Sequence, residues 1–181
     1  MSIRENSIKL IVRNIVIKNT LCSVSLLFLF SHQVFASTQI EGRCYQGICF
    51  DFSVGTKKLI KKTKLGSLYE VNIQTFQYSY NQPERQLVNS GSQYALCSTK
   101  KPAIIFPSYD KKNYIVHLLN PGVSYVGYNL DSYKLYWFIC HDLVNRDLFG
   151  DKIKPYARRL GYNGQLKEEQ ISVKNPLQML P

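Results

Sequence analysis

Two of the three histidines are the residues of this sequence best suited to catalysis. His117 lies in an otherwise apolar segment, and His141 directly precedes Asp142. A histidine can act as a general base, so a small secreted hydrolase that uses His117 or His141 is one hypothesis. The sequence has no nucleophile elbow, zinc-protease, Walker or dinucleotide-binding motif. We therefore assign no catalytic residue, and we expect a non-enzymatic protein.

The densest charge is a run of five lysines within eight residues, which Gly66 follows. The five are Lys57, Lys58, Lys61, Lys62 and Lys64. Lysine offers a mobile point charge more than a defined geometry, so any anion that binds it should bind weakly at high salt. The alternative interpretation is an exposed loop that keeps the protein soluble. We predict that the run is a basic loop and forms the binding site.

All thirteen tyrosines follow residue 36, where they alternate with lysine, asparagine and glutamine. Tyrosine combines a large apolar ring with a hydroxyl group, which suits recognition of proteins or sugars. Tyrosine is also common in β-strands for reasons of packing alone. The binding hypothesis predicts a tyrosine-rich face beside the basic loop.

The cysteines after residue 36 are even in number, which predicts two disulfides in an oxidising compartment. We prefer Cys44 with Cys49 across a tight loop that contains Gly47. Cys97 and Cys140 each end an apolar, strand-like segment, so we expect them to pair at equivalent ends of neighbouring strands. The spacing lacks a C-x-x-C pair, and we predict neither a metal site nor a cofactor.

The first 36 residues have the pattern of a cleavable secretory signal peptide. Four cations precede an apolar run at 21–30, which is about half as long as a membrane-spanning helix requires. Val34, Phe35 and Ala36 are suited to cleavage before Ser37. An uncleaved anchor that begins further upstream is disfavoured, because the four cations interrupt it. We predict cleavage after Ala36 and no permanent membrane span.

Cleavage would remove four of the 23 cations and one of the 12 acidic residues, so the remaining 145 residues keep a net charge of +8. Export to the periplasm or the cell exterior disfavours nucleic acid as the partner of a basic surface. The expected partner is an anionic component of the envelope or of a host surface, or an acidic protein. A structural envelope component without a soluble ligand is a third hypothesis.

Short apolar runs separated by turn residues predict a single β-rich domain over residues 37–162. The predicted strands cover 43–54, 69–80, 94–97, 103–106, 114–119 and 133–140. The last of these is apolar on both alternating faces, so we predict a central strand covered on both sides. Apolar residues change face near Thr75, which predicts a β-bulge there. We expect turns at 81–84 and 89–92.

A helical period appears near the C-terminus, at Ile153, Tyr156, Ala157 and Leu160. It predicts a helix at about 151–161, with Asp151 as its N-cap and Gly161 at its end. Residues 163–181 are polar and contain two prolines, so we predict a flexible tail. The predicted fold is a small antiparallel β-sandwich or barrel with two disulfides and a short C-terminal helix packed on it.

Overall fold

The computed structural model describes residues 37–123, 127–144 and 150–180. The predicted signal peptide at 1–36 lies outside the described residues, so it remains a prediction. Within the described ranges, no helix has the length and apolar character needed to cross a membrane.

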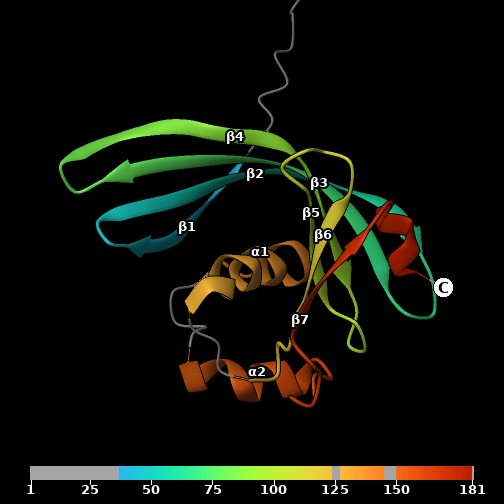
Figure 1. Ribbon diagram of the computed structural model, residues 1–181. Coiled ribbons are helices and arrows are strands. Elements are labelled where there is room, and N and C mark those ends of the chain that lie inside the picture. The colour runs from blue at the N-terminus through green and yellow to red at the C-terminus, as the bar shows by residue number, and fades with distance from the viewer. Residues whose placement is uncertain (1–36, 124–126, 145–149, 181) are drawn as a thin grey trace, which may run out of the picture. The chain divides into compact units, whose positions relative to one another are not determined.

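Within these ranges, seven antiparallel strands form one sheet, and their order in the sheet is their order in the chain. They are β1 (Thr38–Tyr45), β2 (Ile48–Lys62), β3 (Ser67–Ser79), β4 (Gln82–Cys97), β5 (Ala103–Pro107), β6 (Tyr114–Leu118) and β7 (Glu169–Val173). The first four strands include the longest, and they curve over a helix (Figure 1). The mainly β, antiparallel class is confirmed, and the layer packed on the sheet is helical.

Helix α1 (Leu130–His141) packs on one face of the sheet, which we call the inner face. It follows the short helix η1 (Gly127–Asn129). Its side chains meet Val54, Val71 and Ile104 of the sheet in one buried cluster. Helix α2 (Ile153–Arg159), which follows η3 (Gly150–Lys152), adds Ile153 and Ala157 to this cluster. Helix α1 is therefore enclosed by sheet and helix.

The prediction of a central strand at 133–140 is wrong, because these residues belong to α1. The helix has buried residues around most of its circumference, namely Ser132, Tyr133, Leu135, Tyr136, Trp137 and Ile139. A helix that is covered on several sides loses the one-sided pattern that distinguishes it from a buried strand. Covering on both sides was expected correctly, and the type of element was not.

The outer face of the sheet carries a second apolar cluster, closed by the C-terminus. Met179 and Leu180 pack there against Leu68, Leu96 and Val116. Met179 belongs to helix η4 (Pro176–Met179), whose N-cap Asn175 accepts a hydrogen bond from the backbone N–H of Leu177. The segment expected to be a flexible tail thus forms β7 and η4. The segment can be polar because β7 is held in the sheet by its pairing with β6 and has only half-buried or exposed side chains.

Both predicted disulfides are confirmed. Cys44 pairs with Cys49 across the β1–β2 hairpin, where Gln46 and Gly47 adopt the positive φ angles that a tight turn requires. Cys97 at the end of β4 pairs with Cys140 in the last turn of α1, with a Cα–Cα distance of 5.4 Å. The second bond therefore joins strand to helix, where we expected two strands.

The remaining local predictions are each confirmed in part or wrong. The β3–β4 register shifts between Thr75 and Phe76, as predicted, although the extra residue, Val88, lies in β4. The turn expected at 89–92 is part of β4, since its small polar residues continue the ladder with β3. The helix near 151–161 is confirmed and Gly161 follows it with φ of +91°, but its N-cap is Lys152 in place of Asp151.

Candidate functional site

The lysine run is mostly strand, where we expected a loop. β2 continues to Lys62, but β1 pairs with it only up to Val54, so the later residues have a strand on one side alone. All five predicted binding lysines are exposed, and Lys64 follows in the β2–β3 turn. Charged side chains are common on such unpaired strand edges, which explains how a polar run remains extended.

The five lysines do not share one face of the sheet. Lys58 and Lys61 lie opposite Glu70 and Leu68 of β3, on the outer face. Lys57 and Lys62 lie opposite Val71 and Ser67, on the inner face. A bulge at Ile60, the extra residue between the paired positions, sets this pattern. The run therefore presents charge to both sides of the edge.

Lys57 is engaged within the protein. Its Nζ lies 2.7 Å from Oδ1 of Asp142 and donates a hydrogen bond to the carbonyl oxygen of Ile139 at 3.1 Å. Both partners are at the C-terminus of α1, where the helix dipole favours a positive charge. Lys57 thus anchors the helix end to β2, and we remove it from the candidate binding set.

A pocket of about 350 Å³ lies next to the Lys57–Asp142 ion pair. Val54, Val71 and Phe138 give it an apolar wall, and Thr38 and Thr56 contribute polar groups. It is at the low end of the size range of small-molecule sites. It lies beside the point at which β1 leaves the edge of β2 uncovered.

The buried side chain of Ser98 joins the β2–β3 turn to the β4–β5 turn. Its hydroxyl donates a hydrogen bond of 2.6 Å to the carbonyl oxygen of Leu65. The same oxygen accepts hydrogen bonds from the backbone N–H groups of Lys100 and Lys101, at 3.1 and 3.0 Å. One hydroxyl therefore fixes the second turn and ties it to the first, so that the lysines of both turns lie at one end of the sheet.

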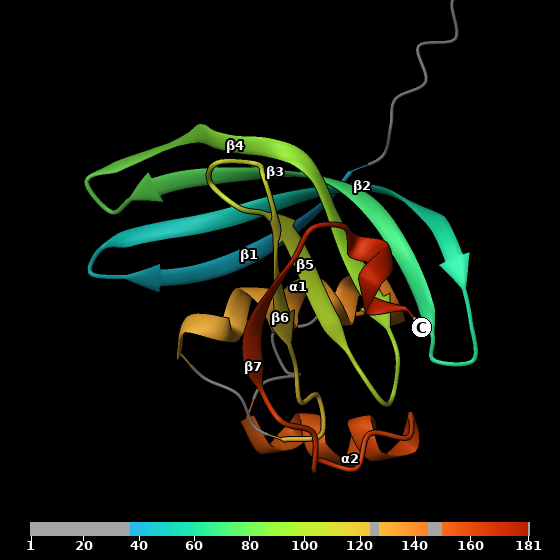
Figure 2. The ribbon, with the colours of Figure 1, turned by 45° about the vertical axis from the view of Figure 1, so that its right-hand side comes forward.

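The end of α2 lies at the same place, as Figure 2 shows for the two turns and the helix. A Cβ atom added to Gly161, just after α2, would lie 3.5 Å from the Thr99 side chain in the β4–β5 turn. We call this region the basic end and define it by seven cations. They are Lys61, Lys62, Lys64, Lys100, Lys101, Arg158 and Arg159.

The basic end has no acidic residue of its own. The chain segments 57–69, 97–109 and 152–167 contain neither aspartate nor glutamate. Among the described residues, no ion pair joins any of the seven cations to a carboxylate. Six of the seven are exposed, and Lys101 is half-buried. The charges therefore add to one positive field and face the solvent.

Sequence reasoning found three of these seven cations and missed the other four. The sequence pattern places Lys100 and Lys101 in a turn, and it places Arg158 and Arg159 in the last turn of a helix. The available signal was the presence of two adjacent cations in each of two further acid-free segments, 97–109 and 152–167. The contact made by Ser98 cannot be inferred from spacing alone.

The structure does not place the most exposed tyrosines beside the lysines. Tyr109, the most exposed, lies in the β5–β6 turn, at the other end of β5 from Lys101, and Tyr45 and Tyr80 lie at the hairpin ends of β1–β2 and β3–β4, at the opposite end of β2 from Lys62. Tyr133, Tyr136 and Tyr162 are buried in the core. The tyrosine content thus reflects packing and strand preference to a large extent, and no tyrosine-rich face adjoins the basic end in the described residues.

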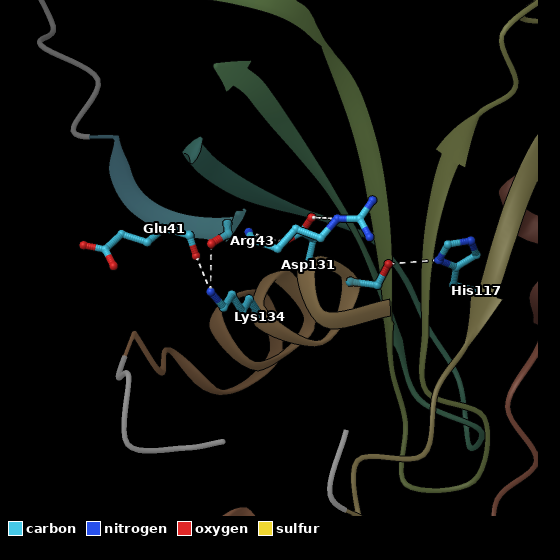
Figure 3. A network of polar contacts seen from close by, with 7 residues as sticks. Glu41, Arg43, His117, Asp131 and Lys134 are labelled. Carbon is cyan, nitrogen blue, oxygen red and sulfur yellow. Dashed lines mark hydrogen bonds and ion pairs between the residues drawn. The ribbon is translucent and has the colours of Figure 1, made fainter. Parts of the chain in front are cut away.

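The two histidines occupy separate places with partners of their own. His117 on β6 lies 2.9 Å from the Ser132 hydroxyl through Nδ1 and 3.0 Å from the Gln170 side chain through Nε2 (Figure 3 shows His117 beside α1). His141 Nε2 lies 2.8 Å from the Tyr162 hydroxyl. Ser132 and His141 are nine residues apart on α1, about 13 Å along its axis. The histidines therefore do not converge on one site.

The hydroxyl next to His141 belongs to a chain of buried polar groups. The Tyr162 hydroxyl lies 2.7 Å from that of Tyr136, which donates to the Ser98 carbonyl. Burial raises the pKa of Tyr162 to about 12, and it also raises the pKa of Tyr136 well above the ordinary value of 10.0. Both hydroxyls thus stay protonated at neutral pH. This arrangement supports the strand that leads into the basic end.

Acidification from about pH 7.5 to about pH 5.5 should lower the free energy of unfolding. Burial lowers the pKa of His117 and of His141 below the ordinary 6.5, so the unfolded chain binds protons first as the pH falls. The histidine contribution is complete above pH 6.5 and is lost as the pH drops through the folded-state values. Urea unfolding at both pH values measures it. Replacement of both histidines by phenylalanine should make the free energy of unfolding less dependent on pH. A pH dependence that is unchanged in this variant would show that the histidines do not cause it.

Comparison of the chain with protein-family models, with curated proteins and with solved structures found no match. The assignment of a function therefore rests on the geometry and charge of the chain itself.

Proposed function

We propose that this protein is an exported, non-enzymatic binding protein that holds an anionic partner at its basic end. The observation that carries the proposal is the pair of acid-free turns that Ser98 holds together. Scattered surface lysines would need no such fixation. A buried hydroxyl with three backbone partners keeps the lysines of both turns in a constant arrangement, which lowers the entropy lost when a ligand binds.

Export is the second part of the proposal. The signal-peptide pattern at 1–36 predicts entry into the secretory route, and the two disulfides fit an oxidising compartment. A periplasmic or extracellular location makes the expected partner an anionic component of the envelope or of a host surface, or an acidic protein. Lysine-dominated binding should be weakly selective among such anions and strongly dependent on salt.

Replacement of Lys61, Lys62 and Lys64 by glutamine should weaken binding to polyanions several-fold at low salt. The probes are vesicles that contain an anionic phospholipid, a sulfated polysaccharide and poly-glutamate, each measured at about 50 mM and about 200 mM salt. The difference between wild type and variant should shrink at the higher salt, because screening reduces each lysine's contribution. The probe that retains the largest difference identifies the class of partner.

The matched control replaces Lys111, Lys112 and Lys174 by glutamine. These exposed lysines lie at the other end of β5 and β7, and their removal changes the net charge by the same amount. Equal loss of binding in both triple variants would show that net charge, and not the basic end, attracts the probes. A structural envelope component without a ligand predicts that neither variant changes anything.

The alternative of a small hydrolase gains no support from the described residues. His117 and His141 lie in separate structural contacts, and the four described cysteines are in disulfides. The histidine variants of the pH experiment serve as its test. They should bind the polyanions as wild type does if the protein is a binding protein.

A further inference from the structure

The edge of β1 that faces away from β2 is covered by charged side chains of α1. Asp131 accepts a hydrogen bond from the backbone N–H of Arg43 at 2.9 Å, and it also pairs with the Arg43 guanidinium. Lys134, one helical turn on, donates to the carbonyl oxygens of Glu41 and Gly42 at 2.7 and 3.1 Å (Figure 3). Backbone groups of residues 41–43 that another strand would need are thus occupied.

Two further free edges carry other features that oppose pairing with a foreign strand. The edge of β2 beyond Val54 contains four lysines and two register shifts. The edge of β7 is five residues long, and its first residue, Glu169, pairs with Lys167. Lysines, bulges and short length are the usual means by which proteins prevent edge-to-edge association.

The edge of β4 shares the register shifts, two of which fall within residues 82–89, but it carries no lysine. β5 pairs only with Tyr94, Ala95 and Leu96, so residues 82–93 have no strand on that side. From Gln86 to Gln93 this edge has no charge, and residues 82–92 are all exposed. Leu87 and Val88 at its centre have exposed fractions of 54% and 50%. Beyond Pro83, Glu84 and Arg85 this edge is uncharged and has exposed apolar side chains, which suits strand pairing.

We propose that a second copy of this chain pairs with β4, so that residues 82–93 of the two copies run antiparallel about a twofold axis. β5 takes over the edge at Tyr94, which limits an added strand to residues 82–93. Full overlap of the two segments places Leu87 of each copy opposite Val88 of the other. The exposed apolar pair is thereby self-complementary, as a twofold interface requires.

Charge also fits this register. Glu84 lies opposite Gly91 and Arg85 opposite Ser90 of the other copy, so like charges do not face each other. Arg85 is moreover paired with Asp51 of its own chain, with 2.5 Å between Nη2 and Oδ2. The basic end adjoins the C-terminal end of β4, so antiparallel pairing sends the two basic ends in opposite directions. Two chains of net positive charge can therefore associate without bringing their lysines together.

Sedimentation velocity of the full chain, oxidised and at rising concentration, tests the proposal. Wild type should pass from monomer to dimer, and Val88→Lys should raise the dissociation constant at least tenfold, because it places two lysines close to the twofold axis. Leu59→Lys is the matched control, since Leu59 is equally exposed, at 50%, and lies on the edge of β2. The control should dimerise as wild type does.

Hydrogen exchange on wild type provides a readout that depends on no variant. Backbone amides within 82–93 should gain protection as the concentration rises, and those in 55–62 should not. A protein that stays monomeric at millimolar concentration overturns the proposal, as does a dimer that Leu59→Lys dissociates and Val88→Lys leaves intact. A monomer whose 82–93 amides become protected only on addition of a synthetic peptide of residues 82–93 would also overturn it, and would assign the edge to an extended peptide.

Discussion

Replacement of Cys97 and Cys140 by serine is expected to lower the free energy of unfolding by about 4 kcal/mol, the larger of the two disulfide contributions. The bond closes a loop of 43 residues, and the entropy that a crosslink removes from the unfolded chain grows with loop length. It also joins α1 to the strand that leads into Ser98. Urea unfolding of the oxidised proteins, monitored through the single tryptophan, Trp137, measures the loss.

The control for this prediction is serine at Cys44 and Cys49. That bond closes a hairpin with a separation of five residues, so its loss should cost about 2 kcal/mol. The long-loop variant should also bind polyanions less well, because Cys97 precedes the residue that holds the two basic turns together. Equal stability losses in the two variants would show that loop length does not determine the effect.

Arg85→Ala is expected to destabilise the fold by about 3 kcal/mol, which is large for a half-exposed arginine. Its partner Asp51 lies on the outer face with an exposed fraction of 1%, and apart from the ion pair with Arg85 neither carboxylate oxygen has a hydrogen-bond partner among the described residues. Loss of Arg85 leaves a buried carboxylate without a countercharge, which is among the costliest single changes in proteins. Chemical denaturation of the variant measures the loss.

The double variant Arg85→Ala, Asp51→Asn isolates the cause. It removes the unpaired charge, so it should recover part of the stability lost in Arg85→Ala, and a double-mutant cycle gives the coupling between the two residues. Tyr78 supplies a second readout. Burial is the main cause of its raised pKa, the Asp51 charge adds to it, and Arg85 opposes it. The tyrosine pKa should rise further in Arg85→Ala, and a cycle without coupling would refute the assigned role.

The sequence allowed correct prediction wherever a local pattern determines the structure. The period-two alternation along β3, the parity of the cysteines and the i, i+3, i+4 spacing near Ile153 each depend on neighbouring residues. The change of face near Thr75 predicted a register shift, and only the strand that carries the extra residue was missed.

The failures came where distant parts of the chain determine the structure. Helix α1 appears as a strand in the sequence because the sheet and α2 cover it from several directions. Strand β7 has few apolar residues, since it pairs with β6 through the backbone and its side chains do not enter the main core. The basic end depends on Ser98, whose partner Leu65 is 33 residues away. No spacing rule relates these two residues.

The order of the strands has a consequence for the way in which the chain folds. Strands β2 to β6 each pair with their immediate predecessor across a short turn, so these hairpins can form one after another as the polypeptide emerges, whereas β7 joins only after α1 and α2 have been made. Helix α1 is different, because the cluster that it enters has walls from β1 to β5. We therefore expect its docking to be a late event in folding. Cys140 meets Cys97 only at that step, so oxidation of this pair should accompany completion of the core.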